Sequence, residues 1–331
     1  MQAIVYTEYG SPDVFRLVEV EQPVPQAGEV LVEIHAVATN AVDWRYLRCV
    51  PAFVRIDAGL RRPKNTILGA DIAGRVAAVG SDVQQFQPGD AVFGEISMCG
   101  FGGFAEYAAV PESVLVKKPA KVSFEEAAAV PTVGFTALQG LRDFGKMQPG
   151  QTVLINGASG GVGTFAVQLA KAFGAEVTGV CSTRNLELVR SIGADHVIDY
   201  TQEDFSRSGQ HYDLIFDVVA DRPVSDFKRV LRPGGRCVVA GFTTTAHMVF
   251  QVVLHGAWIS LTGSKKIGTM GSAKPNHDDL VFIAELLETG KVVPVIDRQY
   301  SLSETAEAIR YLEAGHARGK VIITVEQNSH T

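Results

Sequence analysis

The stretch TVLINGASGGVG, residues 152–163, decides the fold of this 331-residue chain. Its first five residues form an apolar run that is typical of a buried parallel strand. Glycine-rich residues follow, and residues 164–171 carry apolar side chains at helical spacing before a stop at Gly174. A second apolar run over residues 176–181 completes a strand, loop, helix and strand. This order predicts the βαβ unit of a dinucleotide-binding parallel sheet.

The glycine-rich loop predicts where a cofactor would bind. Glycines let backbone amides approach a pyrophosphate, and the first turn of the following helix offers unpaired N–H groups. The usual G-x-G-x-x-G spacing falls on Ala158, Gly160 and Gly163, so alanine stands at the first position. A Gly-rich surface loop would not explain the periodicity on either side. We therefore expect cofactor contacts from Ala158, Ser159, Gly160, Gly161, Val162 and Gly163.

The end of the second strand predicts which dinucleotide binds. An NAD site usually places Asp or Glu there to bind the ribose 2′-hydroxyl. This chain has Ser182, Thr183 and Arg184 instead, and its next carboxylate is Glu187. Hydroxyls and a guanidinium suit a 2′-phosphate, which predicts NADPH rather than NADH. The alternative for Arg184 is a solvated charge at the start of a helix.

The composition limits the class of protein. The chain is 46% hydrophobic and 20% charged, which is ordinary for a soluble globular protein long enough for two domains. A net charge of −6 gives no reason to expect nucleic acid or a membrane surface as partner. The four cysteines are scattered without a C-x-x-C pair, which argues against a disulfide framework and a thiolate zinc site. The start lacks a signal-peptide pattern, and the richest apolar run, residues 246–261, is broken by polar residues. We expect a cytoplasmic protein with reduced thiols.

The remaining pattern predicts two domains. Residues 1–122 contain alternating runs rich in Val and Ile between Pro and Gly turns, which favours an antiparallel β domain. Residues 123–263 alternate helices and strands, which predicts a doubly wound α/β domain whose last strand covers residues 257–263. Ser123 and Glu126 predict a capping box at its first helix. Residues 264–331 are expected to return to the first domain, because the parallel sheet is then complete.

Five motifs in a fixed order resemble the medium-chain dehydrogenase/reductase superfamily. They are NAVD at 40–43, GADIAG at 69–74, PGDAV at 88–92, GFAEY at 103–107 and the stretch 156–163. The branch that they resemble is the zinc-free quinone oxidoreductase type, which includes zeta-crystallin and alkenal reductase-like members. The resemblance implies a GroES-like antiparallel β catalytic domain, a doubly wound Rossmann domain and a C-terminal strand that rejoins the first domain. It also implies a homodimer formed through the last Rossmann strand, here residues 257–262.

The resemblance further implies chemistry without a metal. Zinc-dependent members carry Cys and His ligands where this chain has Asn40 and Ala70, and only Cys99 remains in the region of their structural zinc loop. The eight histidines show no metal-ligand spacing. A quinone or an activated enone needs less help from a Lewis acid than a plain ketone, although the developing oxyanion still needs donors.

Zinc-free relatives use polar residues just after the first motif. The candidate catalytic residues are therefore Asn40, Asp43, Trp44, Arg45 and Tyr46. Arg45 or Tyr46 would polarise the acceptor oxygen, and Trp44 would form a wall for a planar substrate. The alternative is a structural ion pair between Asp43 and Arg45, with Trp44 in the core.

The relatives and the strand ends add further cofactor contacts. These are Thr136, Tyr200, Val219, Gly241 and Phe242. Residues 263–266 and 319–320 would close over the cofactor or form solvated loops. The sequence thus predicts an NADPH-dependent, zinc-independent reductase of quinones or α,β-unsaturated carbonyls. The alternatives are an NADPH-binding structural or regulatory protein of the zeta-crystallin kind and a zinc-type alcohol dehydrogenase.

Overall fold

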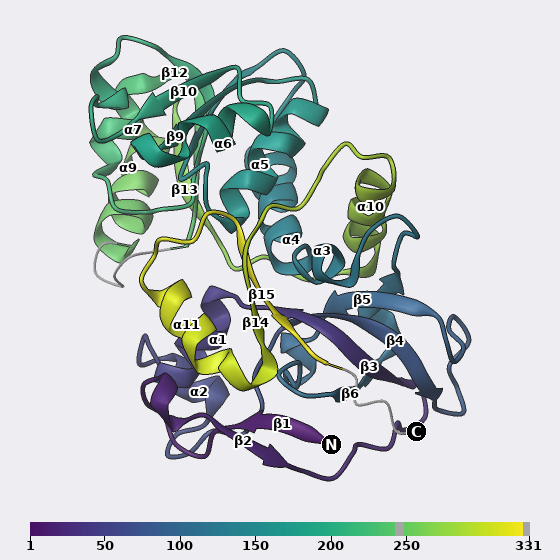
Figure 1. Ribbon diagram of the computed structural model, residues 1–331. Helices are drawn as coiled ribbons and strands as arrows, with labels where there is room; N and C mark the ends of the chain where they lie inside the picture. Colours follow the sequence, from purple (N-terminus) through teal and green to yellow (C-terminus); the bar gives the residue numbers. More distant parts are fainter. Residues whose placement is uncertain (242–247, 327–331) are drawn as a thin grey trace. The chain divides into compact units, whose positions relative to one another are not determined.

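The computed structural model describes residues 1–241 and 248–326 and divides into two compact units (Figure 1). Unit 1 comprises Met1–Thr132, Pro275–Thr289 and the chain from Pro294 onward. Unit 2 comprises Val133–Lys274 and Gly290–Val293. No helix among the described residues has the length and apolar character needed to cross a bilayer.

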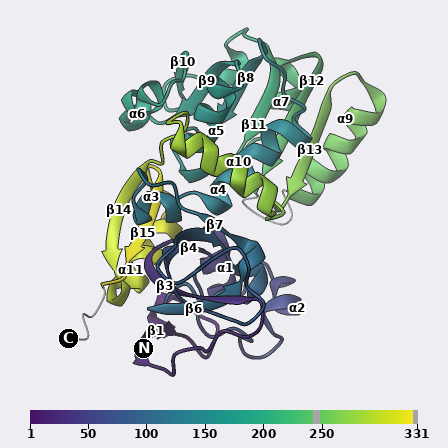
Figure 2. The same ribbon diagram turned by 90° about the vertical axis from the view of Figure 1, so that its right-hand side faces the viewer.

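Unit 2 is built on a six-stranded parallel sheet in the order β10-β9-β8-β11-β12-β13. Helices α5 and α6 lie on one side of this sheet, and α7 and α9 lie on the other (Figures 1 and 2). This is the predicted doubly wound Rossmann fold, and β8 and β9 cover the predicted residues. The strands are β8 (Thr152–Asn156), β9 (Glu176–Cys181), β10 (His196–Asp199), β11 (Tyr212–Asp217), β12 (Leu231–Ala240) and β13 (Lys266–Gly271). The helices are α5 (Gly161–Ala172), α6 (Leu186–Ser191), α7 (Val224–Val230), η7 (Met248–His255) and α9 (Gly256–Thr262), with η4 (Gly140–Phe144) before β8.

The predicted last strand, residues 257–263, is wrong: this segment is helix α9. Across η7 and α9, the buried residues Val252, Gly256 and Ile259 recur every three or four positions, which is the helical period. The hydroxyl of Ser260 accepts a hydrogen bond from the backbone N–H of Ile267 at 2.8 Å and so joins the helix to the true sixth strand, β13. Residues 257–262, through which a strand-mediated dimer was predicted, therefore belong to a helix.

Unit 1 is a mainly antiparallel β domain, in which β14 and β15 pair in parallel. Its main sheet has the order β14-β15-β3-β4-β5-β7, β6 pairs with β3, and β1 and β2 form a separate pair. The strands are β1 (Gln2–Val5), β2 (Arg16–Glu19), β3 (Glu29–Ala38), β4 (Asp71–Val79), β5 (Ala91–Glu95), β6 (Tyr107–Pro111), β7 (Leu115–Lys117), β14 (Ile296–Ser301) and β15 (Lys320–Thr324). The helices are α1 (Ala41–Arg48), α2 (Val54–Ala58), α3 (Phe124–Ala128), α10 (His277–Glu288) and α11 (Thr305–Glu313), while α4 (Pro131–Gln139) begins in unit 1 and continues into unit 2.

The C-terminal strand β15 pairs antiparallel with the end of β3, where Ile322 lies opposite Ala38. This pairing places the tail in the first sheet, where the sequence analysis expected it. The predicted capping box is also present, because Ser123 Oγ accepts from Glu126 N at 3.1 Å and Glu126 Oε2 accepts from Ser123 N at 2.8 Å.

The unit boundaries differ from the predicted domain limits at 122 and 263. Helix α3 belongs to unit 1, because it packs on β3 and β4 and its Phe124 ring stacks on His35 at 4.3 Å. Residues 264–274 belong to unit 2, because β13 extends the parallel sheet beside β12.

Candidate cofactor site and polar cluster

The glycine-rich loop between β8 and α5 leaves room for a ligand at one defined position. A side chain at Gly163 would place its Cβ 2.0 Å from the Gly157 carbonyl oxygen, so this glycine is required for helix packing. A Cβ at Gly160, the N-cap of α5, would meet nothing nearer than 3.6 Å. Gly160 is therefore not needed by the fold, and the space beside it adjoins the free N–H groups of the first turn. Half-buried Gly161 and Val162 form that turn, and the arrangement fits a dinucleotide pyrophosphate.

Asn185 joins this loop to the end of β9, and sequence reasoning did not single it out. It is 4% exposed, and its Nδ2 donates to Ser159 Oγ at 2.9 Å and to Ser182 Oγ at 3.2 Å. Its Oδ1 is buried without a hydrogen-bond partner among the described residues. Asn185 can bridge Ser159 and Ser182 only because the glycine-rich loop and the end of β9 lie side by side, which the order of residues alone does not reveal.

The residues predicted to bind a 2′-phosphate lie beside a carboxylate from the neighbouring strand. Thr183 Oγ1 donates to Asp199 Oδ2 at 2.5 Å, and Asp199 ends β10 opposite Cys181 of β9. The hydrogen bond from Thr183 contributes most to holding the pKa of Asp199 below its usual value. Arg184 and Tyr200 are exposed beside it. A carboxylate was expected only directly after β9, whereas Asp199 ends the neighbouring strand β10.

The other predicted cofactor residues are distributed around the sheet. Half-buried Thr136 lies in α4, Val219 follows β11 and is 40% exposed, and Gly241 follows β12 at a φ of +94°. Phe242 lies outside the described residues.

The point where the strand order of unit 2 reverses carries a polar pair. Asn156 Nδ2 at the end of β8 donates to Asp217 Oδ1 at the end of β11 at 2.8 Å. This end of an open parallel sheet is where ligands bind.

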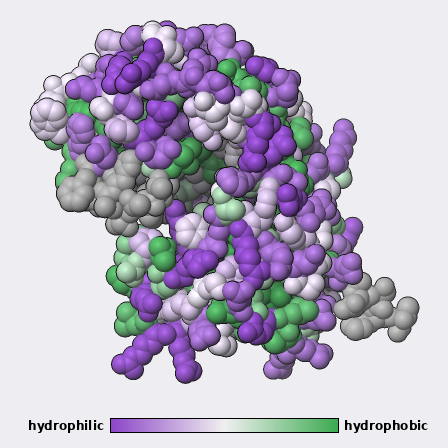
Figure 3. All heavy atoms as spheres, turned by 60° about the vertical axis from the view of Figure 1, so that its left-hand side comes forward, coloured by the Kyte–Doolittle hydropathy of each residue, from purple (hydrophilic) through white to green (hydrophobic). Residues whose placement is uncertain are grey.

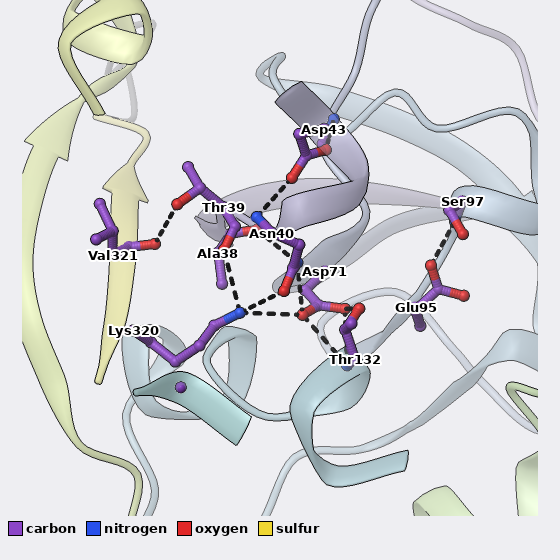
Figure 4. Close-up of polar contacts among 12 residues, drawn as sticks. Ala38, Thr39, Asn40, Asp43, Asp71, Glu95, Ser97, Thr132, Lys320 and Val321 are labelled. Atoms are coloured by element: carbon purple, nitrogen blue, oxygen red, sulfur yellow. Dashed lines mark hydrogen bonds and ion pairs between the residues drawn. The ribbon is translucent and has the colours of Figure 1, made fainter. Parts of the chain in front are cut away.

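Unit 1 contains a buried polar cluster around Lys320, the first residue of β15 (Figure 4). The Lys320 side chain is 5% exposed. Its Nζ lies 2.6 Å from Asn40 Oδ1, 3.2 Å from the Thr39 carbonyl oxygen and 3.7 Å from Asp71 Oδ2. Sequence reasoning treated residues 319–320 as a loop over the cofactor or in solvent. The pairing of β15 with β3 buries this lysine instead.

Asp71 is the anion of the cluster. Its Oδ1 accepts from Thr132 Oγ1 at 2.7 Å and from Thr132 N at 3.1 Å, and its Oδ2 accepts from Asn40 Nδ2 at 2.9 Å. Burial raises the pKa of Asp71 and lowers the pKa of Lys320, and each charge opposes the shift of the other. N–H groups of Thr132 and Asn40 donate to both oxygens of Asp71, which favours its carboxylate form opposite the Lys320 ammonium group.

Asn40 and Asp43 hold the start of α1 in place. The Asn40 amide donates to Asp71 and to the Ala38 carbonyl oxygen at 3.2 Å, so both of its hydrogens are used. Asp43 is fully buried, and its two oxygens accept from Asn40 N at 2.7 Å and Gly69 N at 3.1 Å. Burial raises the pKa of Asp43 to about 7. Neither side chain has a group left to offer a substrate.

The other predicted catalytic residues lie on α1. The Arg45 guanidinium lies 5.4 Å from the centroid of the Trp44 ring, and both residues are half-buried. The Tyr46 hydroxyl donates to the Asp57 carboxylate, and burial together with this contact raises the pKa of Tyr46. The hydroxyl hydrogen of Tyr46 is thus occupied.

The donor set of the cluster does not fit a zinc ion. It holds an ammonium group beside an amide and a carboxylate, whereas zinc sites use Cys, His or carboxylate ligands with no competing cation. Glu95, 5% exposed and opposite Asp71 on β5, keeps Oε2 without a hydrogen-bond partner among the described residues. Burial and Asp71 raise the pKa of Glu95 to about 7. Within residues 1–241 and 248–326, no group of three His, Cys, Asp or Glu residues could hold a metal ion.

Two family models match parts of the chain. Residues 26–120 match the family model described as an alcohol dehydrogenase GroES-like domain, and residues 192–323 match the model described as a zinc-binding dehydrogenase. The chain is 36% identical to quinone-oxidoreductase QR1, chloroplastic, of Triphysaria versicolor, over 98% of both chains.

Two further comparisons cover the chain at similar levels. It is 36% identical to the NADPH-dependent alkenal/one oxidoreductase, chloroplastic, of Arabidopsis thaliana, over 98% of this chain and 79% of the relative. The solved structure of the quinone oxidoreductase from Coxiella burnetii matches with a TM-score of 0.85 and 30% identity, over 98% of this chain and 99% of that one.

Proposed function

We propose, from the premise that the chain belongs to the quinone oxidoreductase and alkenal reductase branch of the medium-chain dehydrogenase/reductase superfamily, that it reduces quinones or α,β-unsaturated carbonyls with NADPH and without zinc. The observation that carries the proposal is the loop before α5, where Gly160 keeps the helix N-terminus open while Gly163 is needed for packing. A bound NADPH supplies the hydride.

The preference for NADPH rests on Ser182 and Arg184. Asn185 donates to Ser182 Oγ, and Ser182 donates to no residue that the structure describes, so its hydrogen can bind a phosphate oxygen. The exposed Arg184 adds a guanidinium that suits a 2′-phosphate. The negative charge of Asp199 is partly offset, because Thr183 and Thr201 donate to its oxygens at 2.5 and 2.8 Å. The name of the Arabidopsis relative supports the same cofactor.

The proposal of zinc-free chemistry rests on the Lys320 cluster. A positive charge already lies 2.6 Å from the Asn40 side chain, where a second cation would be repelled. Hydride transfer to a quinone or an enone leaves an oxyanion, which a protein donor can stabilise before water supplies the proton.

The contacts of α1 favour Arg45 over Tyr46 as that donor. The hydroxyl hydrogen of Tyr46 is bound by Asp57, and both amide hydrogens of Asn40 are used within the cluster. Arg45 carries several N–H groups and is stacked on Trp44, which offers a flat wall for a planar acceptor.

The test is NADPH oxidation beside NADH against a naphthoquinone, phenanthrenequinone, an alkenal and a simple aldehyde. We expect turnover of the quinones or the alkenal with NADPH, retained after treatment with a chelator and without stoichiometric zinc. Arg184→Ala should raise the KM for NADPH about 10- to 100-fold, because a charge-assisted hydrogen bond contributes about 1.5–3 kcal/mol, and should leave the KM for NADH unchanged. Arg190→Ala is the control, since Arg190 pairs with Glu187 at 2.5 Å. An unchanged NADPH to NADH ratio in Arg184→Ala would refute the cofactor assignment, and tight NADPH binding without any turnover would favour a binding protein.

Homodimerisation and a cytoplasmic location are further parts of the proposal. We place the pairing at β13, the last strand of unit 2 along the chain and one of the two edge strands of its sheet, with β12 on one side. All four cysteines are free thiols, which suits a reducing compartment. Light scattering on the purified chain measures the oligomeric state directly.

A further inference from the structure

Asn185 is a buried polar side chain that folding alone does not explain. Hydrophilic residues predominate on the face drawn in Figure 3, whereas Asn185 is only 4% exposed. Its Nδ2 donates to Ser159 Oγ at 2.9 Å and to Ser182 Oγ at 3.2 Å, so both amide hydrogens are used. Its Oδ1 is buried without a hydrogen-bond partner within residues 1–241 and 248–326. Because a buried acceptor without a partner lowers stability, an apolar residue of the same shape would serve the fold as well. What distinguishes this side chain is its pair of donor hydrogens.

The two serines that Asn185 binds lie where two different phosphates are expected. Ser159 directly precedes Gly160, and a Cβ at Gly160 would meet nothing nearer than 3.6 Å, so this is the open start of α5 assigned to the pyrophosphate. Ser182 follows the end of β9, where the ribose 2′-position is recognised. Both serines are half-buried. Asn185 therefore connects the expected pyrophosphate position to the expected 2′-phosphate position.

The amide also decides what each serine can offer to a ligand. An amide nitrogen donates and does not accept, so each serine oxygen accepts from Asn185 and keeps its own hydrogen. Neither serine donates that hydrogen to a residue that the structure describes. A hydroxyl that donates to a phosphate oxygen forms a strong, charge-assisted hydrogen bond. Both serines thus have a hydrogen available for an anion.

We propose that Asn185 is a positioning residue that presents Ser159 to the pyrophosphate and Ser182 to the 2′-phosphate of one NADPH molecule. The inference rests on the proposed preference for NADPH and deepens it, because Asn185 acts through the serines and does not touch a phosphate itself. NADPH depends on Asn185 through both serines, whereas NADH has no 2′-phosphate and depends on it through Ser159 alone. Asn185 therefore sets part of the preference between the two cofactors.

The first test measures binding by the fluorescence of NADPH and NADH, so it needs no acceptor and no turnover. Asn185→Leu removes both donors and keeps the approximate shape of the side chain. We expect its affinity to fall about 100-fold for NADPH and about tenfold for NADH, since each lost charge-assisted hydrogen bond costs roughly a factor of ten. Asn185→Asp is the second variant. Its carboxylate would accept the serine hydrogens itself and should weaken NADPH at least as much.

The second test separates the two phosphate positions with two competitors of NADPH. ADP carries the pyrophosphate, and 2′-AMP carries the 2′-phosphate. Ser159→Ala should weaken ADP alone, Ser182→Ala should weaken 2′-AMP alone, and Asn185→Leu should weaken both, each about tenfold. Because Asn185 acts through Ser182, combining Asn185→Leu with Ser182→Ala should weaken 2′-AMP no more than either change does by itself.

The control is Gln168→Leu, which removes another buried amide of unit 2. Gln168 Nε2 donates to the Thr164 and Val293 carbonyl oxygens at 3.1 and 2.9 Å, so its contacts are structural. The control should lower thermal stability and leave the ratio of the NADPH and NADH affinities unchanged. Equal losses of NADPH and NADH in Asn185→Leu, or a roughly 100-fold loss of 2′-AMP in the double variant, would overturn the inference. A wild type that binds 2′-AMP no better than 5′-AMP would instead refute the proposed preference for NADPH, and the inference with it.

Discussion

Replacing Lys320 by methionine tests whether the buried cluster depends on an internal cation. Methionine keeps most of the side-chain volume but removes the contacts to Asn40 Oδ1 at 2.6 Å, the Thr39 carbonyl oxygen at 3.2 Å and Asp71 at 3.7 Å. Asp71 then remains as a buried carboxylate held only by Thr132 and Asn40. Breaking a buried ion pair by removing one partner costs about 3–5 kcal/mol. We expect the lower end, about 3 kcal/mol, because those hydrogen bonds remain.

The assay is urea unfolding in a Trp258→Phe background, which leaves Trp44 as the fluorescence reporter of unit 1. The control is Lys117→Met on β7, whose side chain is 63% exposed and pairs with Asp90 at 3.2 Å. This surface pair should contribute under about 1 kcal/mol. Adding Asp71→Asn to Lys320→Met should restore part of the loss, because no unpaired charge is then left in the interior.

The loss should also depend on pH with a defined sign. Without the ammonium group the folded pKa of Asp71 rises further above its unfolded value. The folded state then holds a proton that the unfolded chain has released, so stability falls as pH rises between the two values. The difference between Lys320→Met and the wild type should therefore narrow near pH 5 and widen near pH 8. A loss no larger than that of Lys117→Met, or no effect of Asp71→Asn, would refute the internal-cation account.

Two further predictions follow from buried and glycine positions. Burial raises the pKa of Glu95 from 4.5 to about 7, so the contribution of Glu95 to the free energy of unfolding is fully present below pH 4.5 and is lost as pH rises through 7. Near pH 8 the Glu95→Gln variant should therefore be more stable than the wild type by about 2–3 kcal/mol, measured by urea titration. Gly163→Ala should destabilise unit 2 by about 1–3 kcal/mol, because the added Cβ would lie 2.0 Å from the Gly157 carbonyl oxygen. Gly160→Ala should instead leave thermal stability intact and weaken NADPH binding in a fluorescence titration. Equal stability losses for the two alanine variants would contradict the separate roles of the glycines.

The sequence predicted those elements whose signal is local. Strands β8 and β9 have the predicted bounds, because each is a continuous apolar run next to turn residues. Helix α9 was predicted as a strand because a short apolar run carries no period of its own, and the true strand β13 was missed because KIGTMG contains two glycines. Strand β14 was missed because IDRQYS has few apolar residues.

The candidate site likewise has a part that the sequence predicted and a part that it did not. The glycine loop and the residues after β9 follow one another along the chain, so their spacing alone indicated a dinucleotide. Asn185 bridges Ser159 and Ser182 across two elements, and Lys320 contacts a residue 280 positions away, so neither role has a local signature.

Lys320 belongs to the C-terminal strand β15, so the buried cluster of unit 1 depends on the last part of the chain. The cation of the cluster is delivered by β15, which forms only when the C-terminal segment pairs with β3. Until then, Asp71 and Asn40 lack the charge that balances their burial, so the first 132 residues cannot complete their own polar interior. Closing so long a loop costs little more entropy than closing a moderately long one, since that cost grows only with the logarithm of loop length. The buried ion pair therefore links the completion of the antiparallel sheet to the arrival of the last strand of the chain.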